Sequence, residues 1–374
     1  MIENSTNITP AKSRLLSLDV MRGLIMILLA AESCLLYNSL NDVTVDNSFA
    51  GNIVAQFFHH DWHGLLFWDL VQPAFMLMAG SALYISWYAK SKKGITWANN
   101  LTHILSRSFK LFLCGTALHC VYSGKLVWEL WNVLTQLSIT TIIAYLIIRK
   151  SNVWQIIFSL SLLVLTEVLY RYVNVPGYDQ PFVQGHNFGS YTDMLFMGKI
   201  NDGGWVAINF IPTAVHTIWG VLAGKLLIAT YSEKTKIKYL ALAGLASLFV
   251  GYALDILAIT PIIKRISTSS FVLVSGGYVL LIMALLFWIN DVKKYAKYSW
   301  LFTVVGMNAI FIYLFFETIG HQWLNNFVAI FVKGFLGFTP LSAGIIAVIS
   351  AIVTLLLEWS LCYWLYKRKI FFKL

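Results

Sequence analysis

The chain has 374 residues, of which 58% are hydrophobic and only 12% are charged, and its mean hydropathy is +0.71. Soluble domains carry about 25% charged residues, so this composition excludes an ordinary soluble domain and indicates an integral membrane protein. The net charge of +10 could suggest nucleic-acid binding. However, most Lys and Arg residues lie in alternate connections between apolar segments, which is an orientation signal for membrane helices. We therefore expect no nucleic-acid partner.

Ten apolar stretches are long enough to cross a bilayer, whose core of about 30 Å needs about 20 helical residues. In chain order they are 17–38, 65–88, 104–123, 127–148, 153–172, 205–230, 238–257, 268–290, 298–319 and 340–366. They lack the apolar–polar alternation of a membrane barrel. The sequence therefore predicts an all-α, polytopic integral membrane helical bundle of about ten transmembrane helices in a single domain, 1–374.

Polar segments complete the predicted organisation. Residues 1–13 are expected to form a flexible cytoplasmic N-terminus, and residues 173–204 a large extracytoplasmic loop. No small-residue cleavage site follows the first apolar run, so we expect 17–38 to be a retained span and not a signal peptide. The distribution of Lys and Arg places both termini in the cytoplasm and the segment around residue 59 outside. The basic side is also expected to contact anionic lipid.

The first polar motif, Ser17-Leu18-Asp19-Val20-Met21-Arg22-Gly23, lies at the inner end of the first span. Asp19 and Arg22 are three residues apart, so they share one face of a helix and can pair there. Two interpretations remain open. The pair could simply close a helix end, or it could place a guanidinium near a phosphorylated cytoplasmic cofactor, which the fork geometry of Arg suits.

A histidine cluster, His59-His60-Asp61-Trp62-His63, precedes the second span, and Asp69 follows within its first two turns. An ionisable residue at that depth normally faces the protein interior and has a partner. One interpretation is catalytic, because histidine moves protons near neutral pH and a carboxylate can orient its ring. Two alternatives stay open: a metal site made by the histidines and Asp61, and structural histidines at the membrane surface.

Two later motifs carry polar groups that are unusual in a membrane span. Lys264 and Arg265 are cations on the predicted outer side, against the orientation rule, so they are expected to hold an acidic acceptor or a neighbouring carboxylate. Gly306-Met307-Asn308 allows close helix packing around one amide. The four cysteines all lie in apolar spans and are expected to be small buried hydrophobes.

Together these motifs resemble the heparan-α-glucosaminide N-acetyltransferase family. The resemblance extends from residue 14 to about residue 320 and is nearest to bacterial members, especially those of Bacteroidetes. The residues that carry it are 17–23, the pattern His59-x-x-Trp62-His63-Gly64-Leu65, Asp69-Leu70-Val71-x-Pro73, Gly220 and Gly224 before Lys225, 261–268 and Gly306-Met307-Asn308-Ala309.

The resemblance implies a multi-pass enzyme of the bacterial cytoplasmic (inner) membrane that takes acetyl from cytoplasmic acetyl-CoA and places it on a glucosamine amine across the membrane. The active-site histidine of the family lies three residues before the Trp, which here makes it His59, and we expect Asp69 to orient it. A family asparagine near the end of the first span has no match, because Ser33 occupies that position next to Glu32.

The other expected roles follow from the side of the membrane on which each residue lies. Residues on the outer side or deep in the bundle are expected to bind the acceptor glycan: His60, Asp61, Trp62, His63, Lys264, Arg265 and Asn308. Residues on the cytoplasmic side are expected to bind the acetyl-CoA: Asp19, Arg22, Arg107 and Lys110. No metal is expected. A proton-coupled solute transporter and a sugar O-acetyltransferase remain open as alternative functions, and a homodimer remains open as an assembly.

Overall fold

The computed structural model describes residues 15–372, so the expected flexible segment 1–13 lies outside the described residues. Within the described range the chain is helical and has no β-strand, and an isolated bridge pairs His63 with Ile263. The all-α class predicted from the sequence is confirmed.

The helices fall into two compact units. Of the described residues, the first unit contains 15, 60–65 and 69–288, and the second contains 16–59, 66–68 and 289–372. The expectation of one domain over 1–374 stays a prediction.

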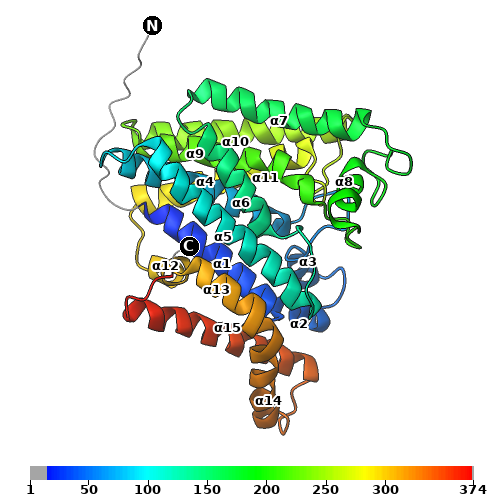
Figure 1. Ribbon diagram of the computed structural model, residues 1–374. Helices are drawn as coiled ribbons and strands as arrows, with labels where there is room; N and C mark the ends of the chain where they lie inside the picture. The colour runs from blue at the N-terminus through cyan, green and yellow to red at the C-terminus, as the bar shows by residue number, and fades with distance from the viewer. Residues whose placement is uncertain (1–14, 373–374) are drawn as a thin grey trace. The chain divides into compact units, whose positions relative to one another are not determined.

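The first unit consists mainly of long helices. In chain order they are α4 (Val71–Ser91), α5 (Trp97–Ser123), α6 (Val133–Leu146), α7 (Asn152–Tyr172), α8 (Phe188–Met197), α9 (Phe210–Ile228), α10 (Glu233–Ile256) and α11 (Ser269–Phe287), with a 3₁₀ turn at Ala207–Asn209. Several begin at a polar residue whose side chain accepts a backbone amide, as at Thr96, Ser151 and Ser232. Figure 1 shows α10 beside α11 and α4 beside α9, pairs that pack along much of their length.

Helices α4 and α9 cross at two glycines. A Cβ added at Gly80 would lie 2.0 Å from the carbonyl oxygen of Thr217, and one added at Gly220 would lie 2.0 Å from that of Leu77. The Ser81 hydroxyl donates to the Gly220 carbonyl at 2.9 Å. The two backbones can approach this closely only because neither glycine carries a side chain.

Replacing Gly220 by alanine will force α4 and α9 apart, and we expect a loss of about 1–3 kcal/mol in the free energy of unfolding, as for other overpacked sites. Unfolding of the detergent-solubilised protein measures this loss. Gly334→Ala is the matched control, because a Cβ there meets nothing within 4 Å. Equal stability of the two variants would contradict the close crossing.

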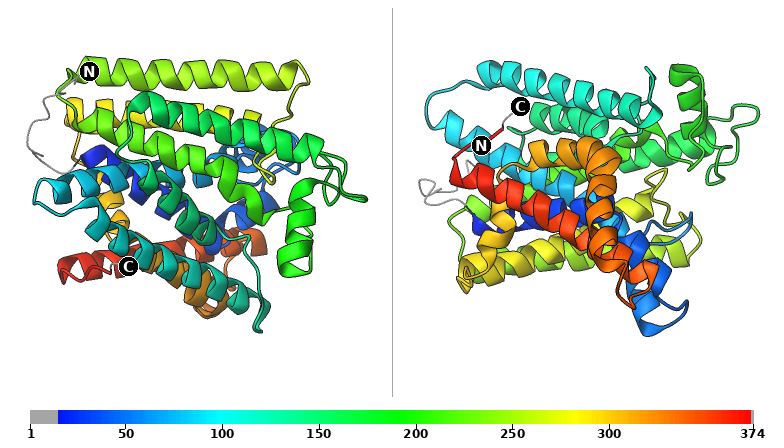
Figure 2. Two further views of the ribbon diagram at one scale, coloured as in Figure 1. Left: turned by 45° about the horizontal axis from the view of Figure 1, so that its top comes forward. Right: turned by 90° about the horizontal axis from the view of Figure 1, so that it is seen from below.

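The second unit contains shorter and broken helices. They are α1 (Leu16–Ser33), α2 (Leu36–Val43), α3 (Phe49–Ala55), α12 (Ser299–Gly306), α13 (Ala309–Phe315), a π-helix at Phe316–Leu324, α14 (Asn325–Leu336) and α15 (Ala343–Lys367). A 3₁₀ turn, Phe67–Leu70, and a short π-helix, Trp288–Val292, lie where the chain passes between units. Figure 2 shows α14 and α15 of this unit together, and the two helices are in contact.

Two sequence motifs meet in the second unit, where α1 packs on α12. A Cβ at Gly23 would overlap the carbonyl of Phe302, and one at Gly306 would lie 2.8 Å from the carbonyl of Asp19. The start of α1 is fixed by Asp291, whose two carboxylate oxygens each accept a backbone amide, from Leu16 and Ser17, at 3.0 Å. The close helix packing expected at Gly306 is therefore present, and its packing partner is the motif 17–23 of α1.

In the described part of the chain, seven helices are long and apolar enough to cross a membrane, or up to nine if each bent pair counts as one span. The bent pairs are Leu16–Ser33 with Leu36–Val43, at 61°, and Ser299–Gly306 with Ala309–Leu336, at 75°. Stretch 298–319 was expected to be one span, but the helix breaks at Met307–Asn308 and continues to Leu336. The count of ten and the orientation of the termini stay predictions.

Candidate active site

The histidine segment pairs with the loop between α10 and α11. His63 and Ile263 form the antiparallel bridge, and the Gly64 amide donates to the Ile262 carbonyl at 2.9 Å. Gly64 has φ +146°, and a Cβ there would lie 2.4 Å from Nε2 of His60. Glycine at this position therefore lets the backbone turn and leaves space for the His60 ring.

His63 has a carboxylate partner on α10. Its Nε2 lies 2.7 Å from Oδ1 of Asp255, and the same oxygen accepts the Ile262 amide at 2.9 Å. The His63 side chain is exposed and Asp255 is partly exposed. Asp255 thus binds both segments that form the bridge. Local spacing could not predict its pairing with His63, because the two residues are far apart in the chain.

A buried ion pair lies beneath the histidine segment. Asp69 is fully buried, and its Oδ1 lies 3.4 Å from Nζ of Lys264, which is also buried. Its Oδ2 accepts the backbone amide of His60 at 3.3 Å. Of the two expectations for Lys264, an acidic acceptor or a neighbouring carboxylate, the structure places a carboxylate beside it. Asp69 therefore joins α4, the loop after α10 and the histidine segment.

The ring of Trp205, the residue that directly follows the predicted outer loop, lies against Lys264 and Arg265. Nζ of Lys264 lies 5.4 Å from the ring centroid of Trp205, and the Arg265 guanidinium lies 5.8 Å from it. Arg265 also donates to the carbonyl of Gly203. The Trp62 indole donates to the Phe182 carbonyl at 2.8 Å. The outer loop is thus folded back onto the histidine segment and the two cations.

Two nitrogen atoms in this region are buried without a hydrogen-bond partner: Nδ1 of His60 and Nε of Arg265. Buried polar atoms are nearly always hydrogen-bonded in native proteins. Both residues belong to the set expected to bind the acceptor. Asp61, the remaining member of the histidine segment, is exposed.

His59 is the residue before His60 and belongs to the second unit. Its ring centroid lies 6.5 Å from that of Trp68, a buried side chain whose backbone amide donates to the Gln56 carbonyl at 2.9 Å. The His59 side chain is half-buried. Asn308 also lies in this unit, where its amide bonds the backbone of Ile370 and Phe372 at 3.0 Å each, so its role at an acceptor stays a prediction.

The residues expected to bind acetyl-CoA divide between the units. In the second, Asp19 is buried and pairs with Arg22 at 3.5 Å, as the three-residue spacing predicted. In the first, Arg107 and Lys110 are exposed on one turn of α5. Their roles stay predictions.

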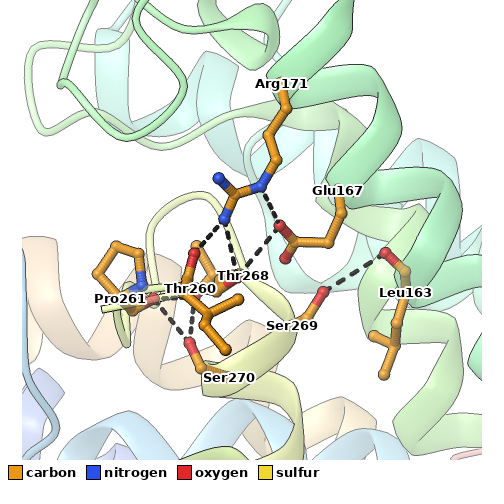
Figure 3. Close-up of polar contacts among 9 residues, drawn as sticks. Leu163, Glu167, Arg171, Thr260, Pro261, Thr268, Ser269 and Ser270 are labelled. Carbon is orange, nitrogen blue, oxygen red and sulfur yellow. Dashed lines mark hydrogen bonds and ion pairs between the residues drawn. The ribbon is translucent and has the colours of Figure 1, made fainter. Parts of the chain in front are cut away.

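A polar network that we did not predict holds the loop after α10 in place (Figure 3). Glu167 and Arg171 of α7 pair at 2.9 Å, and Thr260 donates to the same carboxylate at 3.2 Å. Ser270 and Thr268 both donate to the Pro261 carbonyl at 2.7 Å. The four-residue spacing of Glu167 and Arg171 was the available signal, and the network sets the position of Lys264 and Arg265.

A second unpredicted cluster lies where α8 meets the end of α5. Glu129 pairs with Lys199 at 2.7 Å and with His119 at 2.8 Å. Burial favours neutral Glu129, but the hydrogen bond and charge of Lys199 outweigh it and lower the pKa of that carboxyl. Next to it, Asp193 accepts the Trp131 indole at 2.6 Å and the Ala207 amide at 3.0 Å. The cluster thus ties α8 to the chain on either side of it.

Asp193 will make stability depend on pH. Burial raises the pKa of Asp193 from 3.8 to about 6, and hydrogen bonds from Ala207 and Trp131 offset only part of this rise. The folded protein therefore keeps a proton that the unfolded chain has released, so the free energy of unfolding should fall as the pH rises from about 4 to about 6. Unfolding measured across this range should lose that slope in Asp193→Asn and keep it in Asp42→Asn, an exposed control. A slope of the opposite sign that Asp193→Asn abolishes would contradict the assignment.

Comparison with known proteins bears on what this site does. Residues 14–259, about two thirds of the chain, match the family model described as heparan-alpha-glucosaminide N-acetyltransferase, catalytic. The chain belongs to this family. It is also 24% identical to heparan-alpha-glucosaminide N-acetyltransferase of Mus musculus over 431 aligned positions, which cover 97% of this chain and 61% of the mouse protein. The chain therefore spans less than two thirds of that relative.

The chain thus belongs to a family of N-acetyltransferases, and its described residues include seven or more helices that are long and apolar enough to cross a membrane. The resemblance stated from the motifs is confirmed. Residues 15–372 contain no group of three His, Cys, Asp or Glu side chains arranged to hold a metal ion, and the absence of a metal stays a prediction.

Proposed function

We propose that this protein transfers an acetyl group from cytoplasmic acetyl-CoA to the amine of a glucosamine-type sugar on an extracytoplasmic glycan, in the inner membrane of a bacterium. The observation that carries the proposal is the histidine segment itself. It has the spacing of the family motif, and it is held in place by the bridge to Ile263 and by the bond from the His60 amide to Asp69.

His59 acts as the general base. It takes a proton from the acceptor nitrogen while that nitrogen attacks the thioester carbonyl. The new C–N bond forms, the C–S bond breaks, and the coenzyme A thiolate receives the proton. The thioester is the more reactive acyl compound, so the transfer runs downhill without another energy source.

Asp69 acts as a positioning residue. Its carboxylate accepts the amide of His60, the residue next to His59 in the chain, and its charge is balanced by Lys264. This is one way in which Asp69 could orient His59, as the resemblance led us to expect. Asp69 thus restricts where the imidazole can lie.

Two buried nitrogen atoms and several side chains around the histidine segment are our candidates for acceptor binding. Nδ1 of His60 and Nε of Arg265 can each bond a sugar hydroxyl, and Trp62, Trp205 and the exposed Asp61 suit sugar stacking and amine recognition. The phosphates of acetyl-CoA need cations on the opposite side. Arg22, which Asp19 orients, and the exposed Arg107 and Lys110 are our candidates.

Membranes that contain the protein, incubated with acetyl-labelled acetyl-CoA and glucosamine, test the proposal. Label should enter the sugar as an amide that survives mild alkali. Label that mild alkali removes would indicate O-acetylation of a hydroxyl. Glucose, which lacks the amine, is the matched control. Sugar uptake into sealed vesicles without acetyl-CoA, and with no labelled product, would overturn the proposal in favour of transport.

A further inference from the structure

The second unit contains a buried carboxylate that the proposed reaction does not use. Glu358 lies in the middle of α15, one of the helices long enough to cross a membrane, and is 2% exposed. Neither carboxylate oxygen has a hydrogen-bond partner among the described residues, or any appreciable surface that a water molecule could touch. Ionisable residues within membrane helices are costly and usually functional.

The backbone opposite Glu358 is shaped around the carboxylate. The π-helix Phe316–Leu324 brings Gly320 against it, and a Cβ at Gly320 would lie 2.5 Å from Oε1 of Glu358. A π-helical turn inside a helix is rare and often marks a functional site. Here it is braced by the Ser33 hydroxyl, which donates to the Phe316 carbonyl at 2.6 Å.

Among residues 15–372, the titratable groups that interact electrostatically with Glu358 include no Lys or Arg. Glu317 of the π-helix acts on it as a like charge. The thiols of Cys34, between α1 and α2, and of Cys362, one turn along α15, are also close enough to interact with it. His321, which could become cationic, bonds the Ser33 carbonyl through Nδ1 at 3.2 Å. Asn325 of α14 donates to that same carbonyl at 2.7 Å.

An ionised carboxylate in such surroundings would cost several kcal/mol, because burial removes its hydration and no donor replaces the lost water. A metal ion would need several further oxygen ligands and space beside the two oxygens. A proton needs neither. We propose that Glu358 is a membrane-embedded proton-binding site, with Glu317 as its neighbouring carboxyl group.

Proton binding by Glu358 does not depend on acetyl transfer. Binding forms one O–H bond on Glu358 with a proton from water, and release returns that proton to water. A carboxyl of this kind, placed at a π-helix in a bent span, is suited to exchange its proton when that segment moves.

Infrared difference spectroscopy of the full-length protein in lipid tests the site, because a protonated carboxyl has a C=O stretch that the carboxylate lacks. The wild-type protein should show this band near neutral pH and lose it at higher pH. The band should be absent in Glu358→Gln and unchanged in Glu233→Gln, whose carboxyl is exposed.

Glu358→Gln should also fold normally, since an amide has nearly the shape of a carboxylic acid and is equally neutral. A wild-type spectrum without a Glu358 band near neutral pH would overturn the proposal. Failure of Glu358→Gln to fold would overturn it too, because only a charged and paired glutamate is expected to resist that replacement.

Discussion

Replacing His59 by alanine will lower acetyl transfer to glucosamine by about 10²–10⁴-fold, the usual range for loss of a general base. The imidazole is the group that accepts the proton of the acceptor nitrogen, and alanine offers no replacement. The measurement is kcat with labelled acetyl-CoA and glucosamine in membranes, with the amount of folded protein checked by size-exclusion chromatography.

His103→Ala is the matched control for this variant. His103 lies exposed on α5 and has no role in the proposed chemistry, so its loss should leave transfer unchanged. His59→Ala that retains full activity would rule out the general-base role. A stable acetyl group on His59, detected by mass spectrometry of the quenched reaction, would replace direct transfer by a covalent intermediate.

Replacing Lys264 by methionine will destabilise the protein by about 3–5 kcal/mol, the usual cost of removing one partner of a buried ion pair. Asp69 is fully buried, and it would lose the cation that lies 3.4 Å away. Methionine is similar in length to lysine and has no charge, so the loss of stability will come mainly from removal of the charge and not from changed packing. Unfolding of the detergent-solubilised protein gives the change in the free energy of unfolding.

The double variant Lys264→Met with Asp69→Asn should recover part of the loss, because a neutral amide needs no counter-charge and its oxygen can still accept the His60 amide. Lys333→Met, at an exposed position on α14, should change stability by less than about 0.5 kcal/mol. A cost below about 1 kcal/mol for Lys264→Met alone would show that the pair does not hold Asp69. The acetyl-transfer activity of the double variant then shows whether the reaction needs the charge of Asp69 or only its hydrogen bond to the His60 amide.

Hydropathy predicted the long straight helices well. Stretches 65–88, 153–172, 205–230, 238–257, 268–290 and 340–366 each correspond to a helix of membrane-spanning length. Lipid cannot hydrogen-bond the backbone, so a long apolar segment in a membrane must become a helix, and this rule acts on composition alone. The breaks were not predicted. Leu35 has φ +62°, a conformation that its side chain disfavours, and only packing against neighbouring helices explains it.

The candidate site also has features that the sequence predicted and features that it did not. The spacing within short motifs predicted the Asp19–Arg22 pair and the importance of the histidine segment, because those features depend on neighbours in the chain. The partners of Asp69 and His63 lie almost 200 residues away. The sequence indicated that Asp69 and the histidine segment need partners, but it could not indicate which distant residues those partners are.

The sequence by itself determined that this protein is an all-helical membrane protein of an N-acetyltransferase family. Its apolar composition requires a lipid environment, and the motifs of the family are short enough to be recognised from neighbouring residues in the chain. The tertiary structure decided which carboxylate meets which cation, where the spans bend, and that Glu358 is enclosed beside a π-helix. Such pairings depend on how distant helices pack, and a buried charge is stable only where packing supplies its partner or its proton.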